Sequence, residues 1–109
     1  MVCYLVTAEL PYQQAAEWET WMRQVHIPAV LATGCFERAA LWRELVAGDT
    51  ITYVVEYLCP APDAFQRYEE QHAAALRQEH ADRFGRSVRL HRRLLRLCCV
   101  LDLPPVQAP

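Results

Sequence analysis

The first quarter of the chain changes from a strand pattern to a helix pattern. Residues 2–10 are rich in β-branched and aromatic side chains and end at Pro11, which is typical of a strand. From about Gln13 the apolar positions recur every three or four residues, which indicates a helix. The buried face of this predicted helix carries Trp18, Trp21, Met22 and Val25.

Pro28 predicts where this helix stops. Proline has no amide hydrogen and disfavours helical geometry in the residue before it. We therefore expect the helix to end or kink near His26. A short turn over residues 29–33 would follow, with Gly34 as the stop.

The middle of the chain predicts a hairpin followed by a long helix. A second strand over residues 35–46 and a third over 51–58 flank a turn at Gly48 and Asp49. Asp63 followed by Gln66 resembles a capping box and opens a helix over residues 63–84 that stops at Gly85. The buried stripe of this helix would carry Phe65, Tyr68, His72 and Leu76, with Glu79, His80 and Arg83 continuing the same side.

A last strand over residues 87–100 completes the order β-α-β-β-α-β. This order predicts an α+β, ferredoxin-like fold, in which two helices cover one face of a four-stranded antiparallel sheet. We expect a single domain over residues 1–100 and a flexible tail over 101–109.

The strands are apolar on both faces. Tyr53 and Tyr57 alternate with Val54 and Leu58, so the face without helices would expose a large apolar patch. We expect a second copy to cover that face, which predicts a homodimer.

Composition excludes several classes of chemistry. The chain has 109 residues and a formal charge of −2, and all 11 basic side chains are arginine. Without lysine there is no Schiff base and no phosphate-loop lysine, and the only serine, Ser87, lies in no nucleophile motif. With no membrane-spanning run and no signal-peptide pattern, we expect a cytoplasmic protein that does not bind a membrane.

Cysteine spacing does not favour a metal or a disulfide scaffold. The five cysteines form no Cys-x-x-Cys pair, so we expect buried, reduced thiols. Glu69 and His72 match half of a di-iron motif, but a second pair is lacking. We expect no metal and no cofactor.

Three segments carry a resemblance to a known family. They are residues 21–36, with Trp21-Met22, His26-Ile27-Pro28 and Ala32-Thr33-Gly34, and residues 52–57 and 76–85. The chain resembles the bacterial domain of unknown function 4286 family, which is similar to the dimeric α+β barrels of the antibiotic biosynthesis monooxygenase type. The resemblance implies the fold, the dimer and a pocket between helices and sheet. It transfers no catalytic residue, and the arginines and His91 of the last strand depart from the family.

Two histidines are the candidate catalytic residues. His26 lies at the margin of the first helix's apolar face, where it would either line a cleft as a general base or cap the helix end. His72 lies in the buried stripe of the second helix, where it would be either a pocket residue or a core histidine bonded to a tyrosine. The candidate ligand-binding residues are Trp21, Tyr53, Tyr57, Tyr68, His80 and Arg93.

Residues 83–96 concentrate positive charge, with six arginines and no acidic residue. Guanidinium groups bind carboxylates and phosphates, so the segment would either form an anion-binding wall or make ion pairs with Glu9, Glu37, Glu44 or Glu56. An aromatic-basic signature of RNA-binding strands is absent, and we expect no nucleic acid.

Together these features predict a homodimer that binds a small aromatic or acidic metabolite in a helix-sheet pocket. As an enzyme it would act as a cofactor-free monooxygenase or isomerase, with histidine as base and arginine or tyrosine stabilising an anion. The alternative is a non-catalytic structural or interaction domain with core histidines and arginine ion pairs.

Overall fold

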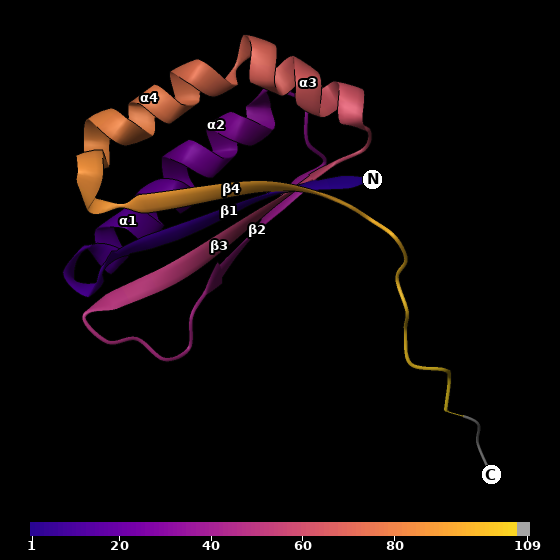
Figure 1. Ribbon diagram of the computed structural model, residues 1–109, viewed down its shortest axis with the longest axis horizontal. Helices are drawn as coiled ribbons and strands as arrows, with labels where there is room; N and C mark the ends of the chain where they lie inside the picture. The colour runs from indigo at the N-terminus through magenta and orange to yellow at the C-terminus, as the bar shows by residue number, and fades with distance from the viewer. Residues whose placement is uncertain (107–109) are drawn as a thin grey trace.

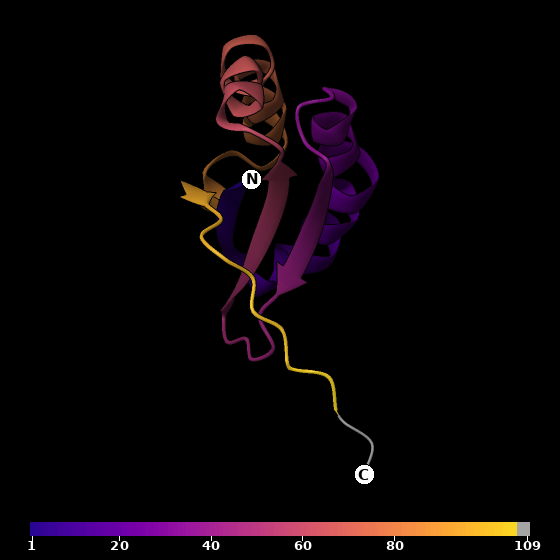
Figure 2. The same ribbon diagram turned by 90° about the vertical axis from the view of Figure 1, so that its right-hand side faces the viewer.

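The computed structural model describes residues 1–106 and has the predicted ferredoxin-like architecture. The sheet order is β2-β3-β1-β4 with every pairing antiparallel, and all helices cover one face of the sheet (Figures 1 and 2). The strands are β1 (Val2–Pro11), β2 (Arg38–Arg43), β3 (Thr50–Cys59) and β4 (Arg89–Arg96). The helices are α1 (Ala15–Trp21), α2 (Ile27–Ala32), α3 (Pro62–Gln71) and α4 (Ala73–Phe84).

The core lies between the sheet and the helices, as the strand alternation predicts. Tyr4 pairs with Tyr57 in the β1–β3 register, and both side chains are buried on the helix-covered face. Trp18 of α1 is only 1% exposed and packs at 4.8 Å from the Tyr53 ring. Buried aromatic side chains from β1, β3, the loop before β2, α1 and α3 therefore form one continuous core.

We expected the first helix to end or kink near His26, and it does not end there. A π-helical turn, η2 (Met22–His26), joins α1 to α2, and the Ile27 amide donates to the Met22 carbonyl five residues earlier. Ile27 is helical, with φ −60° and ψ −45°, although it precedes Pro28. A wider turn relieves the clash of a proline ring with the preceding turn, so the helix continues to Ala32. Gly34, at φ 76°, follows the end of α2 as the predicted stop, but the turn expected over residues 29–33 is wrong because the chain is helical up to Ala32.

The single long helix expected over residues 63–84 is two helices. His72 leaves helical geometry, at φ −130° and ψ −34°, and separates α3 from α4, which bend over the sheet (Figure 1). On one straight helix Tyr68 and His80 would lie about 120° apart, and the bend lets both side chains become buried. The capping box is also wrong, because Ala61 is the N-cap and Pro62 supplies the preset φ of the first turn.

Two strands are shorter than the pattern predicts. β2 covers Arg38–Arg43 rather than residues 35–46, because Cys35 and Phe36 are buried in the core before pairing begins. β4 ends at Arg96, which pairs with Val2 at the start of β1, so the ladder ends with its partner strand. The expected tail over 101–109 lies partly outside the described residues, and residues 97–106 form neither helix nor strand.

The thiols differ from one another in exposure. Cys35 and Cys59 are buried and Cys3 is half-buried, all as free thiols. Cys98 and Cys99 are exposed, so the expectation of buried thiols is wrong for these two. They follow the end of β4, where no helix covers the chain.

Candidate functional site

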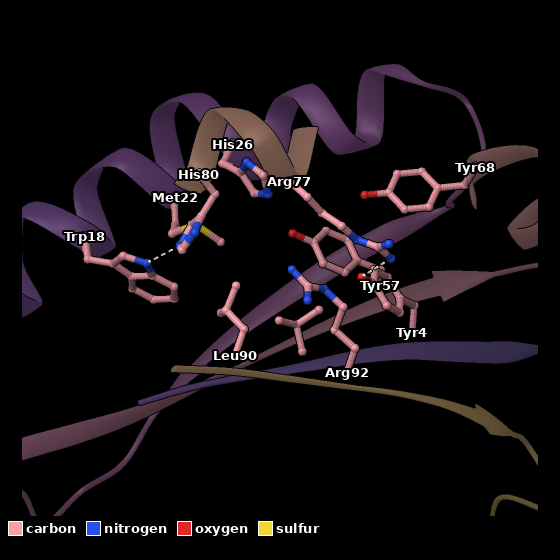
Figure 3. A pocket seen from close by; sticks show the side chains of 11 residues that line it. Tyr4, Trp18, Met22, His26, Tyr57, Tyr68, Arg77, His80, Leu90 and Arg92 are labelled. Carbon is pink, nitrogen blue, oxygen red and sulfur yellow. Dashed lines mark hydrogen bonds between the residues drawn. The ribbon is translucent and has the colours of Figure 1, made fainter. Parts of the chain in front are cut away.

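A small cavity lies between the helices and the β1–β4 side of the sheet (Figure 3). Its volume is about 30 Å³, and its apolar wall includes Trp18, Met22 and Leu90. Seven polar side chains from six elements also line it: Tyr4, His26, Tyr57, Tyr68, Arg77, His80 and Arg92. These residues come from segments far apart in the chain, so the fold alone brings them together.

His26 enters the cavity from the π-helical turn. Its ring stacks on Trp21 at 5.1 Å and lies 6.0 Å from the His80 ring. The Nδ1 atom is buried and, within residues 1–106, has no hydrogen-bond partner. Burial, reinforced by nearby His80 and Arg92, lowers the pKa of His26 to about 4. His26 is therefore a neutral imidazole at pH 7 with a free ring nitrogen.

His80 enters from α4 and is held by the core. Its side chain is 5% exposed, and the Trp18 indole Nε1 donates to His80 Nε2 at 3.0 Å. Because Nε2 accepts this bond, a neutral His80 carries its hydrogen on Nδ1. Burial, with a smaller effect of Arg92, lowers the pKa of His80. The cavity thus holds two neutral imidazoles of different hydrogen-bonding character.

Tyrosines and an arginine form the other end of the cavity. Arg77 of α4 donates to the Tyr4 hydroxyl at 3.1 Å and forms an ion pair with Glu69. Burial raises the pKa of Tyr57 and of Tyr68, so both remain neutral phenols at pH 7. The Arg77 Nε is buried without a hydrogen-bond partner in the described part of the chain. This end of the cavity offers donors to a ligand.

Arg92 brings a second positive charge from the opposite wall. It lies on β4 opposite Val6, on the helix-covered face, and Figure 3 shows it pointing up from the sheet while Arg77 points down from α4. Its charge lowers the pKa of both His26 and His80. Two guanidinium groups therefore line the cavity, that of Arg77 in an ion pair with Glu69, and the lining includes no acidic side chain.

The fold brings together four of the residues singled out from the sequence. His26, His80, Tyr57 and Tyr68 all line the cavity. Trp21 lies behind His26 as a stacking partner. Helical and strand periodicity identified these positions because each lies on an apolar face.

Three other candidates lie elsewhere. His72 is half-buried at the break between α3 and α4 and does not line the cavity. The Tyr53 hydroxyl donates to Glu19 at 2.9 Å, beyond Trp18. Arg93 alternates with Arg92 and so lies on the face without helices.

Sequence reasoning missed Tyr4, Arg77 and Arg92. Arg92 and Arg93 are adjacent in β4 and so lie on opposite faces, but only the register with β1 shows that Arg92 faces the helices. Tyr4 had the signal of an alternating apolar strand position. Arg77 had none, because it follows the predicted buried stripe by one residue.

The arginine-rich segment contributes both to the cavity and to ion pairs. Arg89 pairs with Glu9 at 3.7 Å and Arg83 with Glu17 at 3.6 Å. No group of three or more potential metal ligands occurs within residues 1–106. No helix among those residues is long and apolar enough to cross a membrane.

The fold and cavity define a ferredoxin-like α+β protein with a helix-sheet pocket. Residues 1–98 match the family model described as Domain of unknown function (DUF4286), and the chain belongs to that family. The resemblance noted in the sequence is thereby confirmed. The comparison with curated protein sequences gave no match.

Solved structures share this fold. A mutant of SnoaB, a cofactor-independent oxygenase from Streptomyces nogalater, has a TM-score of 0.70 and 21% identity, covering 92% of this chain and 96% of that one. A putative antibiotic biosynthesis monooxygenase from Deinococcus radiodurans has a TM-score of 0.68 and 12% identity, covering 96% and 100%. A dimeric ferredoxin-like protein from an uncultured marine organism has a TM-score of 0.57 and 11% identity, covering 92% and 97%. At these identities the similarity is one of fold.

Proposed function

We propose that this protein binds a small aromatic or acidic metabolite in the cavity between helices and sheet. The observation that carries the proposal is the convergence of two neutral imidazoles and two guanidinium groups on one space. Arginine is the preferred partner of a carboxylate or another oxyanion, and the aromatic lining suits a planar ring. Guanidinium groups in a cavity lining without an acidic side chain favour an anionic ligand.

As an enzyme, the protein would begin by removing a proton from the bound ligand. A neutral His26 with an unpartnered Nδ1 can accept that proton, and Arg92 can stabilise the anion that remains. Proton removal is the first step of both cofactor-free oxygenation and isomerisation of such ligands. Two structural neighbours, described as a cofactor-independent oxygenase and a putative antibiotic biosynthesis monooxygenase, support the former.

Ligand binding requires the cavity to widen. At about 30 Å³ it has room for a water molecule but not for an aromatic ring. Of the α4 side chains only Ala73 and His80 are fully buried, and Leu76 and Phe84 are partly buried against the core. We propose that α4 moves away from β4 as the ligand enters, while the exposed Arg92 side chain turns toward the anion.

Tryptophan fluorescence tests the proposal because Trp18 lines the cavity and Trp21 stacks on His26. The protein carries Trp42→Phe to remove the exposed third indole and is titrated with salicylate, benzoate and neutral benzamide. We expect saturable quenching by the acids only. Arg92→Met should weaken it at least about tenfold, the value of one charge-assisted hydrogen bond.

Arg93→Met is the matched control, because it removes the same charge from the other face of the same strand. Binding by this variant should equal that of the parent. Equal effects of the two substitutions, or the absence of saturable quenching by any acid, would contradict the pocket proposal.

We also propose a homodimer formed through the sheet face that has no helices. Trp42, which is 58% exposed, and Leu95, which is 41% exposed, join half-buried Leu5, Val54 and Leu58 on that face. Structural neighbours are described as dimeric ferredoxin-like proteins. Light scattering at micromolar concentration should therefore give the mass of two chains, and a single-chain mass would overturn the proposal.

The small cavity also favours a second candidate function, a non-catalytic interaction domain. The Trp18–His80 bond satisfies one histidine within the core, as a structural role requires. If the titration shows no binding while the dimer persists, this second function holds and the pocket proposal fails.

A further inference from the structure

The residues after β4 form an apolar segment that has little contact with its own chain. We call residues 97–106 the C-terminal arm. Leu101, Leu103 and Val106 are 88%, 93% and 98% exposed. Both views show the arm running from the end of β4 away from the helix layer (Figures 1 and 2). The radius of gyration is 16.1 Å, whereas a compact chain of this length has one of about 13 Å.

An apolar groove lies on the sheet face without helices, at the end of β4 from which the arm leaves. Its volume is about 400 Å³, and its apolar lining is Met1, Val2, Cys3, Leu5, Leu58, Leu95 and Leu97. Glu56 and Arg96 are its charged members. The groove is part of the face that we assign to the homodimer, and it suits aliphatic side chains.

The arm is poorly suited to fill the groove of its own chain. The groove already includes Leu97, so the chain would have to reverse immediately after that residue. Residues 97–101 are Leu-Cys-Cys-Val-Leu and contain none of the glycine, proline, asparagine or aspartate that make tight turns. The sequence therefore favours an arm that continues the direction of β4 beyond the body of the chain.

The length and chemistry of the arm suit a second copy. Ten extended residues reach about 33 Å, enough to cross a neighbouring sheet. Pro104 and Pro105 have no amide hydrogens and favour an extended segment that docks through its side chains rather than as a paired strand. In a two-fold dimer each arm can make the same contact, so the exchange closes on itself.

We propose that the two copies exchange arms, so that Leu101 and Leu103 of each chain lie in the apolar groove of the other. This inference rests on the proposed homodimer. It assigns the exposed leucines to the interface, and it makes the arm a determinant of dimer affinity.

Cross-linking tests which chain holds the arm, because Cys3 lines the groove. In a protein carrying Cys98→Ser, Cys99→Ser and Leu101→Cys, a short bismaleimide should join the new thiol to Cys3 of the other chain. The product is a covalent dimer on a denaturing gel, with the bridge located by mass spectrometry. Adding Cys3→Ser should abolish it.

Each other result has a distinct meaning. A bridge within one chain places the arm in its own groove and overturns the exchange. The absence of a bridge in a protein that scatters light as a dimer overturns the exchange and leaves the homodimer intact. A monomer at every concentration overturns the homodimer and the exchange together.

Dimer affinity provides the second measurement. Leu101→Ser combined with Leu103→Ser should raise the dimer dissociation constant by at least about tenfold in sedimentation equilibrium, because two exposed leucines lose their burial. Asp102→Asn, between them, is the matched control and should leave the constant unchanged. The arm lies outside the core, so both variants should fold. An unchanged dissociation constant for the double variant would overturn the proposal.

Discussion

Two imidazoles in one cavity are stabilised in different ways. His80 accepts a hydrogen bond from Trp18, so its burial leaves Nε2 satisfied. His26 has a buried nitrogen without a partner among the described residues, next to His80 and Arg92. A buried polar atom of this kind costs stability, and such a cost is often found at functional sites. His26 is therefore the residue on which a ligand would have the largest effect.

The lowered pKa of His26 predicts that acid destabilises the fold. In the unfolded chain the imidazole takes up a proton near pH 6.5, but in the folded protein only near pH 4. The free energy of unfolding is thus fully maintained above pH 6.5 and falls as the pH drops toward 4. Urea unfolding at several pH values between about 7.5 and 4.5 should show the free energy of unfolding decreasing with falling pH. The His26→Gln variant should have a smaller slope of this free energy against pH.

The remaining slope of that variant belongs to His80, whose pKa is also lowered. Arg92 and the Trp21 ring are the other groups that face His26. The His91→Gln variant is the control, since His91 is exposed on the edge strand β4. The slope of its free energy of unfolding against pH should match that of the unchanged protein. Equal slopes for all three proteins would contradict the assignment.

At the scale of elements, irregular positions in the helices orient the side chains that line the cavity. The π-helical turn places His26 at the cavity, and the break at His72 turns α4 so that His80 and Arg77 face the sheet. Gly85 then ends α4 at φ +59° and ψ −136°, a conformation almost confined to glycine. The direction of the chain into β4, and so the position of Arg92, depends on this turn.

Gly85→Ala should lower the free energy of unfolding by about 1–3 kcal/mol, because a Cβ strains this conformation even though no atom lies within 4 Å of it. Gly48→Ala is the matched control: it also has open space, and its φ is not positive. Its stability should change by less than about 0.5 kcal/mol in the same urea unfolding experiment. A similar loss in both variants would show that the backbone of Gly85 is not strained by a side chain.

At the scale of the whole molecule, the sheet has two apolar faces and helices for only one. One chain buries Tyr4, Val55 and Tyr57 under the helices and leaves Val54 and Leu58 half-buried on the other face. A second copy of the chain presents an identical apolar face that can cover this one. In the proposed homodimer, dimerisation would be part of the folding equilibrium.

The melting temperature should therefore rise with protein concentration. Val54→Glu places a charge on the proposed interface and should remove this dependence and lower the melting temperature at micromolar concentration. Thr20→Glu, on the exposed side of α1, is the control and should keep the dependence. A melting temperature that is independent of concentration for the unchanged protein would contradict a dimer held through this face.

The sequence determined the order of elements and which side chains of each strand share a face. Tyr53, Val55 and Tyr57 are recognisable from alternation alone, because the side-chain period of a strand is two. His26 and His80 were identifiable because they lie beside apolar helical stripes. These features are local, so a single sequence contains them.

The tertiary structure decided which polar residues meet. Arg92 reaches the cavity only through the register of β4 against β1, and His80 replaces His72 there because the helix breaks. The π-helical turn before Pro28 has the same origin, since core packing of α2 outweighs the local preference of Ile27. Register and helix bending depend on contacts between residues far apart in the chain, and no local pattern encodes them.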